Sequence, residues 1–303
     1  MSDAASAPSV SRVLVAGASG YIGTELVAQL EAAGFEVLRL VRREPQGAGE
    51  YRWDPNGGTI DDRAIEEADA VINLAGASTG KIPWTPSYKR EILRSRVEGT
   101  RTLAEAIRRA SARPAVFLSG SAVGYFGSRP GEVLTDESSK GTGFLSDVVH
   151  AWEQAARLTP ATTRLVMFRT GIVVGNGGAF TPLNLLTRLG VGSRLGSGQQ
   201  YWPWISLHDE AAAIVHLLRS DYSGVVSLVG PTPATAETVT KTLARQMKKP
   251  HWLVVPSFAF RMLGDAGKDL ILVDENVQSP TLASTGFTFA HSTIEQAIEA
   301  FVD

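Results

Sequence analysis

The chain has 303 residues, of which 44% are hydrophobic and 20% charged, a composition that leaves room for one large core or two smaller ones. Lys and Arg number 29 against 31 Asp and Glu, and this balance gives no broad basic field. We therefore expect no nucleic-acid partner and no membrane partner. The absence of cysteine excludes disulfides, thiolate metal sites and a cysteine nucleophile.

Residues 1–11 are small and polar and lack the basic and apolar regions of a signal peptide. We expect them to form a frayed tail. No apolar run approaches the ~20 residues that span a bilayer. Together these features favour a cytoplasmic protein.

Residues 13–30 predict a strand, a glycine-rich turn and a helix. The apolar run 13–16 is typical of a buried strand, and residues 22–30 carry apolar side chains at helical spacing. Between them, Gly17 allows a tight turn, Gly20 lets the backbone approach a pyrophosphate, and Gly23 lets the helix pack closely on the sheet. The helix N-terminus adds free N–H groups and partial positive charge. We expect a dinucleotide site here, although a structural glycine turn without a ligand has the same pattern. The residues assigned to it are Gly17, Ser19, Gly20, Tyr21, Ile22 and Gly23.

The second expected strand, Phe35 to Val41, ends in Arg42-Arg43. A carboxylate at this point binds the ribose 2′-OH of NAD, whereas arginine accommodates the 2′-phosphate of NADP. Glu36 comes too early to reach the ribose, and Glu44 is a possible rival. We therefore expect NADP (NADPH), with NAD less favoured and a pair of solvated arginines as the other alternative.

Two further buried strands are expected over residues 70–77 and 115–127, and residues 51–60 are expected to form a loop or short hairpin. The small residues that end the first strand leave space for a ribose or adenosine, because open α/β sheets bind ligands at the carboxyl ends of their strands. A basic segment, 81–96, follows and leads into a helix ending near Arg109. The residues assigned to the cofactor from this region are Leu74, Ala75, Gly76, Arg96, Ser119 and Gly120.

The remaining elements alternate regularly as far as residue 230. Helices are expected at 144–158 and between 175 and 198, and strands at 165–174 and 224–229. A strand from Tyr201 leads into a helix starting at Glu210, with Asp209 as its N-cap. This alternation predicts an α/β, Rossmann-like, doubly wound parallel sheet. Residues 1–230 would form this domain, with 176–203 reaching toward the substrate, and residues 231–303, with two helical patterns, a small C-terminal lobe.

Five motifs together resemble those of the extended short-chain dehydrogenases/reductases. They are Gly17-x-x-Gly20-x-x-Gly23, Asn73-Leu-Ala-Gly76, Ser121-Ala-Val-Gly-Tyr-Phe-Gly127, Arg169-Thr-Gly171 and Trp204-Ile-Ser-Leu-His-Asp209. More narrowly, residues 84–101 and Trp152-Glu153 are similar to the atypical sugar-nucleotide epimerase-like branch, which has its own C-terminal domain. The resemblance implies a domain that binds NAD(P), a small substrate lobe, and a catalytic group of Ser, Tyr, Lys and Asn.

The sequence departs from that catalytic group. Alignment on Glu153 places Leu145 at the Tyr position and Val149 at the Lys position, and Arg96 stands where Asn is usual. Only Ser121 remains. An apolar helix face cannot supply a phenol whose pKa is lowered by a neighbouring ammonium, as the usual proton transfer requires.

Few residues offer a substitute. Tyr125 is a candidate for the catalytic group, or it is a packed aromatic. His150 is expected on the surface and His208 in a structural role, and no spacing of the five histidines indicates a metal site.

Two functions therefore remain open. The first is an NADP-dependent oxidoreductase or epimerase-like enzyme acting on a small carbonyl or sugar-nucleotide. Ser121 would hydrogen-bond the reacting oxygen, and Arg96 would polarise it or hold an acidic substrate. The second is a non-catalytic NADP-binding sensor or partner-binding protein, because the Tyr and Lys are missing. The sequence leaves the substrate and the oligomeric state open.

Overall fold

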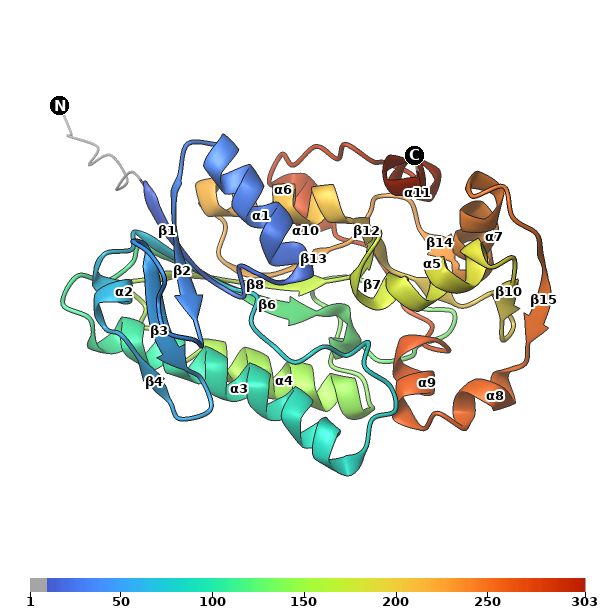
Figure 1. The fold of residues 1–303 in the computed structure, drawn as a ribbon, viewed down its shortest axis with the longest axis horizontal. Coiled ribbons are helices and arrows are strands. Elements are labelled where there is room, and N and C mark those ends of the chain that lie inside the picture. The colour runs from blue at the N-terminus through green and yellow to red at the C-terminus, as the bar shows by residue number, and fades with distance from the viewer. Residues whose placement is uncertain (1–9, 303) are drawn as a thin grey trace.

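The computed structural model describes residues 10–302, so the expected frayed tail lies largely outside the described residues (Figure 1). One eight-stranded sheet runs through the molecule. In spatial order its strands are β13 (Gly224–Leu228), β8 (Arg164–Thr170), β6 (Val116–Ala122), β5 (Ala70–Asn73), β1 (Arg12–Ala16), β2 (Glu36–Val41), β3 (Glu50–Asp54) and β4 (Thr59–Ile60). All pair in parallel except β4, which is antiparallel to β3. The predicted α/β, Rossmann-like sheet is confirmed.

Helices cover both faces of this sheet (Figure 1). Helices α1 (Tyr21–Ala32) and α6 (Leu207–Arg219) pack on one face, and α2 (Arg63–Glu66), α3 (Pro86–Arg109) and α4 (Phe144–Ala156) lie on the other. Successive side chains of a strand point to opposite faces, so Val13 and Val15 of β1 enter one core while Leu14 and Ala16 enter the other. Burial on both faces explains why the central strands are continuous apolar runs.

The predicted single strand over residues 165–174 is wrong at Gly171. There β8 ends, and β9 (Ile172–Val174) leaves the main sheet to pair with β12 (Trp204–Ser206). A Cβ atom at Gly171 would lie 2.3 Å from the Pro203 carbonyl oxygen, so only glycine permits this close passage.

Residues 51–60 form the hairpin of β3 and β4 that the turn residues allowed. The hairpin also extends the main sheet, because Arg39 of β2 pairs in register with Glu50 of β3. The hairpin therefore lies beside the end of β2, which is followed by Arg42 and Arg43.

The other end of the molecule is a smaller lobe (Figure 1). Its elements are α5 (Thr181–Arg188), β10 (Gly192–Leu195), β11 (Tyr201–Trp202), β14 (Ala234–Thr235), α7 (Ala236–Gln246), β15 (His251–Val255), α8 (Ser257–Arg261), α9 (Asp265–Leu270) and α11 (Ile294–Val302). The chain after residue 230 thus holds more helices than the two expected. Between α9 and α11 it returns to the larger part of the molecule: β16 (Asn276–Val277) pairs with β7 (Val133–Leu134) in a separate two-stranded sheet, and α10 (Pro280–Ser284) packs on the main core through Leu282. The division at residue 230 remains a prediction.

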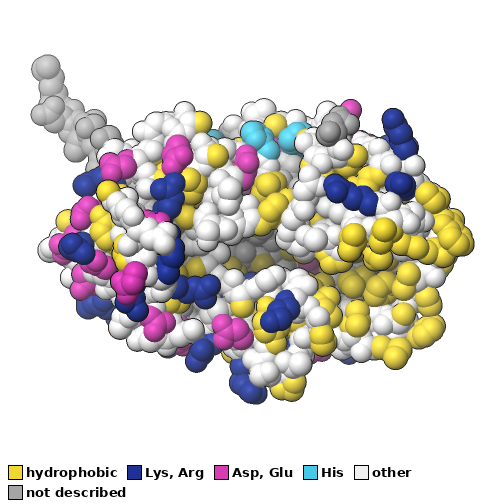
Figure 2. Space-filling view, viewed as in Figure 1, with side chains coloured by type: hydrophobic (Ala, Val, Ile, Leu, Met, Phe, Trp, Pro, Cys, Tyr) yellow, Lys and Arg dark blue, Asp and Glu magenta, His cyan; other side chains and the backbone are white. Residues whose placement is uncertain are grey.

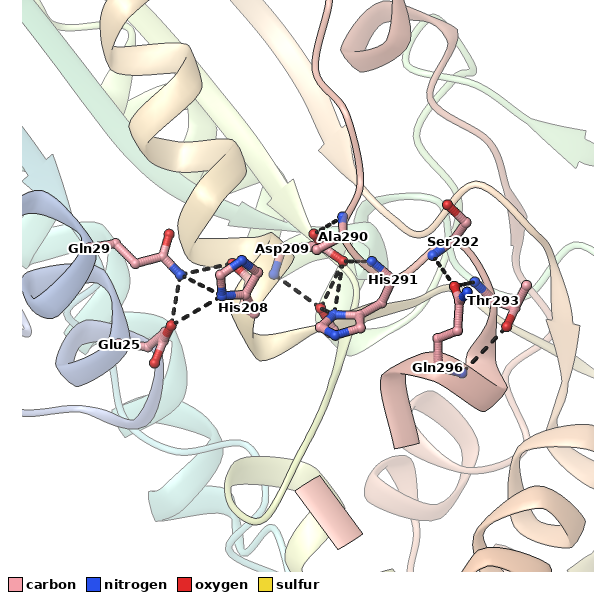
Figure 3. Close-up of polar contacts among 10 residues, drawn as sticks. Glu25, Gln29, His208, Asp209, Ala290, His291, Ser292, Thr293 and Gln296 are labelled. Atoms are coloured by element: carbon pink, nitrogen blue, oxygen red, sulfur yellow. Dashed lines mark hydrogen bonds and ion pairs between the residues drawn. The ribbon is translucent and has the colours of Figure 1, made fainter. Parts of the chain in front are cut away.

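Helix α6 begins at Leu207, and its N-cap is Ser206, whose Oγ accepts from the Asp209 N–H at 3.0 Å. The predicted capping role of Asp209 is therefore wrong. Its buried carboxylate instead accepts the backbone N–H groups of Ala290 at 2.8 Å and His291 at 3.0 Å, and so holds the C-terminal segment against α6 (Figure 3). His208 points the other way, toward Gln29 of α1, in a half-exposed position.

Glu210, the next residue of α6, is a fully buried carboxyl group. Its Oε1 accepts from the Thr170 hydroxyl at 2.6 Å, and its Oε2 has no hydrogen-bond partner. Burial raises the pKa of Glu210 to about 8, so the native protein holds a proton that the unfolded chain releases near the ordinary glutamate pKa of 4.5.

Stability should therefore fall as pH rises from about 4.5 to 8, because the native state binds the extra proton in that window. Glu210→Gln removes this contribution and should flatten the slope. Over that range the difference in unfolding free energy between variant and parent should change by roughly 2–4 kcal/mol. Urea unfolding at several pH values measures it, with the surface variant Glu299→Gln as control. If the unfolding free energies of Glu210→Gln and the parent change in parallel with pH, Glu210 is ionised in the native state.

Candidate dinucleotide site

The turn between β1 and α1 is built from close backbone contacts that only glycine permits. Gly17 has a φ of +86°, and a Cβ there would lie 2.9 Å from the Leu74 carbonyl carbon. A Cβ at Gly23 would lie 2.1 Å from the Gly17 carbonyl oxygen. Gly20 is less crowded, since its Cβ would stand 3.2 Å from that same oxygen. The predicted roles of Gly17 and Gly23 fit this geometry, because both residues meet packing limits, and the expectation that Gly20 faces a pyrophosphate stays a prediction.

A cavity of about 750 Å³ lies over this turn at the carboxyl ends of β1, β2 and β5. Of the predicted cofactor residues, Gly17, Ser19, Gly20, Arg42, Arg43, Leu74, Ala75 and Gly76 line it. A larger hollow of about 1090 Å³ lies at the opposite edge, around Gly34, Ala115 and Arg164, where the strands begin. Open α/β sheets bind ligands at the carboxyl ends of their strands, so we assign the site to the smaller cavity.

The two arginines at the tip of β2 have different partners. Arg43 makes a bidentate ion pair with Glu50, at 2.6 and 2.7 Å, and this hydrogen bonding lowers the pKa of Glu50 to about 2. Glu44 pairs with Arg52 of β3. Arg42 is exposed, and among the described residues it has neither an ion pair nor a side-chain hydrogen bond. Both nearby carboxylates are thus neutralised, which leaves Arg42 as the available charge.

Buried hydrogen bonds fix the loop after β5. The Asn73 side-chain amide donates to the Thr100 hydroxyl at 2.9 Å, and its Oδ1 accepts from the Ala75 N–H at 3.1 Å. The Trp152 indole donates to the same hydroxyl at 2.8 Å. Asn73, α3 and α4 therefore position residues 74–76 at the cavity. Gly120 belongs to this packing, since a Cβ there would lie 2.8 Å from the Asn73 carbonyl oxygen.

Arg96 lies behind the Gly76–Ala77 wall of the cavity. Its Nη1 donates to the carbonyl oxygens of Ala77 at 2.9 Å and Ile92 at 3.2 Å, and its guanidinium stands 5.3 Å from the centre of the Trp152 ring. No carboxylate among residues 10–302 pairs with it. Burial lowers the pKa of Arg96 to about 10, so the group is still charged at neutral pH. Arg96 keeps part of its surface exposed, and a partly buried charge without a counterion favours a negative ligand atom beside it.

Ser121 points at Glu153 of α4 and is not among the residues that line the cavity. Its Oγ donates to Glu153 Oε1 at 2.8 Å, and Arg169 holds the same carboxylate from 2.8 and 3.1 Å. Both ion-pair partners are only 3% exposed. Tyr125 stacks on Arg169, with the guanidinium carbon 3.5 Å from the ring centre. Two of the three predicted catalytic residues, Ser121 and Tyr125, thus meet around the buried Glu153–Arg169 pair, where Tyr125 is a partly exposed packed aromatic.

The α4 positions one and two turns before Glu153 are apolar, as the sequence indicated. Val149 is buried, and Leu145 lies against Gly124, where an added Cβ would stand 3.2 Å from the Leu145 Cβ. His150 is exposed. No phenol or ammonium occupies the positions that Leu145 and Val149 take.

Other predicted cofactor residues lie behind the cavity rather than on its surface. Tyr21 packs over the glycines at 175–178, Ile22 and Gly23 face inward, and Ser119 is buried with its hydroxyl 3.2 Å from the Gly120 carbonyl oxygen. The lining also includes residues that sequence reasoning missed: Ala18, Arg39, Trp53, Pro55, Asn56 and Ser78. The turn at 54–58 was the one available signal for the hairpin residues, and it gave no indication of their position beside the cavity.

No helix within residues 10–302 is long and apolar enough to cross a membrane. In that part of the chain no group of three His, Asp or Glu side chains is placed to hold a metal ion.

The strand order, the glycine turn and the cavity above it define a nicotinamide-dinucleotide-binding protein of the extended short-chain dehydrogenase/reductase type. Residues 13–230 match the NAD dependent epimerase/dehydratase family, and the chain belongs to that family. An epimerase family protein of Mycobacterium bovis is 38% identical over 94% of this chain and 96% of its own length. An epimerase family protein of Staphylococcus aureus is 31% identical over 95% of this chain and 98% of its own.

Solved structures agree. The human epimerase family protein SDR39U1, crystallised with NADPH, has a TM-score of 0.88 at 31% identity, covering 96% of this chain and 99% of its own. A nucleoside-diphosphate sugar epimerase from Corynebacterium glutamicum has a TM-score of 0.79 at 28% identity, covering 97% of this chain and 58% of its own. The predicted epimerase-like resemblance is confirmed.

The buried Glu153–Arg169 pair leads to a stability prediction. Glu153→Gln leaves the Arg169 guanidinium buried without a counterion, and breaking such a pair costs about 3–5 kcal/mol of unfolding free energy. Urea unfolding measures this loss. Glu98→Gln, which removes a surface pair with Arg101, is the matched control and should cost about 0–1 kcal/mol. Equal, small losses in both variants would mean that the buried pair contributes no more than a surface one.

Proposed function

We propose that this protein binds NADPH and acts as an oxidoreductase or epimerase-like enzyme on a small carbonyl or sugar-nucleotide, with Arg96 acting on the reacting oxygen. One observation carries the proposal: two guanidinium groups without carboxylate partners flank the glycine turn. Arg42 follows β2 and Arg96 backs the loop after β5, and these strands lie on either side of β1.

The choice of NADPH rests on Arg42. A 2′-phosphate needs a cation at the tip of β2, and a 2′-OH needs a carboxylate. Here Glu44 and Glu50 are both held by arginines, whereas Arg42 is available. The human relative with a bound NADPH supports the same choice, although more distant relatives of the same fold carry NAD.

The described residues fit such a cofactor. The turn at residues 17–20 carries no side chain at Gly17 or Gly20, which leaves space in the cavity for a pyrophosphate. Residues 74–76 face the same cavity. The nicotinamide supplies hydride chemistry when it is bound, and the protein orients the reactants and stabilises charge.

Arg96 is better placed to act than Ser121. The Ser121 hydroxyl already donates to Glu153, so it would have to leave that bond to serve a substrate oxygen. Arg96 uses Nη1 for two carbonyl groups, and its other nitrogens have no protein partner among the described residues. A fixed cation stabilises an oxygen that gains negative charge without any proton transfer. Arg96 would thus stabilise the negative charge on the reacting oxygen in place of the missing Tyr and Lys. The proton would come from solvent.

The nucleoside-diphosphate sugar epimerase among the relatives supports a sugar-nucleotide as one substrate class. Residues 231–303 would close over such a molecule together with residues 176–203, as a small substrate-side domain beside the domain at 1–230. In this arrangement the carboxyl end of the sheet holds the cofactor, and the small lobe selects the substrate.

Replacing Arg42 should remove the preference for NADPH. In paired titrations followed by nicotinamide fluorescence, Arg42→Ala should bind NADPH about tenfold or more weakly and leave NADH binding nearly unchanged, because it loses one charge-assisted contact to the 2′-phosphate. Arg108→Ala, at an exposed position far along α3, is the control. Equal binding of NADPH and NADH by the parent protein would refute the cofactor assignment.

Replacing Arg96 should reduce turnover more than binding. Arg96→Met keeps the side-chain stem against Trp152 but removes the cation, and the loss of one such electrostatic contact lowers kcat by about 10²–10³. The assay is NADPH oxidation across small carbonyls and sugar-nucleotides. NADPH binding should stay within about threefold of the parent. If the parent protein binds NADPH tightly but none of these substrates causes it to oxidise NADPH, the result would instead support a non-catalytic sensor.

A further inference from the structure

The small lobe presents a continuous apolar surface to solvent. Large side chains on or directly after α5, β15 and α8 are exposed, among them Leu189 at 70%, Trp252 at 68%, Phe258 at 65% and Met262 at 82%. Most of the other large apolar side chains in the described part of the chain are covered. We call this surface the apolar face, made up of Leu185, Leu186, Leu189, Trp252, Val254, Phe258, Met262 and Leu263.

The segments that carry the apolar face lie side by side. Strand β15 pairs with β10, which also contacts α5, and the Trp252 indole donates to the Gly190 carbonyl oxygen next to Leu189. Gly196 follows β10 directly, and a Cβ added there would lie 3.0 Å from the Ser257 Oγ at the start of α8. Figure 2 shows this end of the molecule as a broad yellow area, whereas acidic and basic side chains are mixed over the opposite end.

These segments are also strongly basic. Residues 181–195 and 245–263 contain no Asp or Glu, although the whole chain has an acidic excess of two. Their five exposed cations are Arg188, Arg245, Lys248, Lys249 and Arg261, and none makes an ion pair within residues 10–302. The local charge is therefore the opposite of the overall charge, and it is concentrated around exposed aromatic and aliphatic side chains.

The combination of exposed apolar side chains and unpaired cations discriminates between partners that could bind the apolar face. A second copy of the chain would meet the same face through a two-fold axis and bring five cations against five cations. Nucleic acid would match the charge but leave the aliphatic side chains without a partner. An anionic lipid surface matches both, because apolar and aromatic groups enter the interface while Lys and Arg meet the headgroups.

We infer that the apolar face docks the protein on the surface of membranes containing anionic lipids. The association is peripheral, in keeping with the absence of a spanning helix in the described chain. It is a property of the small lobe alone and does not depend on the reaction proposed above. The expectation of no membrane partner followed from the net charge, which averages over the two ends of the molecule.

Vesicle flotation of the full chain tests this inference. The protein should float with phosphatidylcholine vesicles that contain phosphatidylglycerol, much less with phosphatidylcholine alone, and less at high salt. Trp252→Ser/Phe258→Ser should weaken the partition at least about tenfold, because it removes both exposed aromatic anchors. Lys248→Glu/Lys249→Glu should do the same, because each cation near an anionic surface strengthens partition by roughly fivefold.

Matched controls separate docking from general surface effects. Val133→Ser changes an exposed apolar side chain on β7, and Arg108→Glu/Arg113→Glu reverses two exposed charges near the end of α3. Both should float like the parent, and circular dichroism should report that every variant is folded. Three results would each overturn the inference: no flotation with anionic vesicles, flotation that the control variants lose equally, or a dimer in sedimentation velocity that Trp252→Ser/Phe258→Ser dissociates.

Discussion

The contact of three backbone segments at Gly17 determines the geometry of the cofactor site. The end of β5 and the first turn of α1 both approach this residue so closely that a side chain at Gly17 or Gly23 would overlap a carbonyl group. Strand β1 pairs with β2 on one side and with β5 on the other. The loops that carry Arg42 and Gly76 are therefore both positioned relative to the same turn, and the cavity between them is a consequence of that packing.

Much of this arrangement could be predicted because burial leaves a pattern in the sequence. The central strands are covered on both faces, so they are short apolar runs, and the glycine spacing after β1 has one well-defined structural use. The features that were missed depend on distant partners. Nothing local indicates that β3 joins the sheet, or that a side chain at Gly171 would overlap the Pro203 carbonyl oxygen. The Ser206 cap is the exception, because it is a local contact that the sequence reading assigned to the wrong residue. The partners of the Asp209 carboxylate are distant, since Ala290 lies 81 residues further along the chain.

The arginines show the same limit at the level of the site. Arg42, Arg43, Arg96 and Arg169 all looked like candidate ligands or motif residues in the sequence. In the structure, Glu50 neutralises Arg43 and Glu153 neutralises Arg169, and each of these pairs joins separate elements. Which cation remains available depends on the register of β3 beside β2 and on the face that α4 turns to β6. Residue type and spacing predict where cations gather, and the tertiary pairing decides which of them can meet a ligand.

The surroundings of each unpaired cation indicate which kind of ligand it can bind. Arg96 is partly buried behind Gly76 and Ala77, with its guanidinium 5.3 Å from the centre of the Trp152 ring, so a single small anion or a polarised oxygen is the partner that fits it. The cations on the segments of the apolar face are exposed and share those segments with a broad area of aromatic and aliphatic side chains, which no small ligand could cover. An extended anionic surface can satisfy both the charge and the apolar area at once. The same physical requirement, an unneutralised positive charge, thus points to a small molecule at one end of the protein and to a lipid surface at the other.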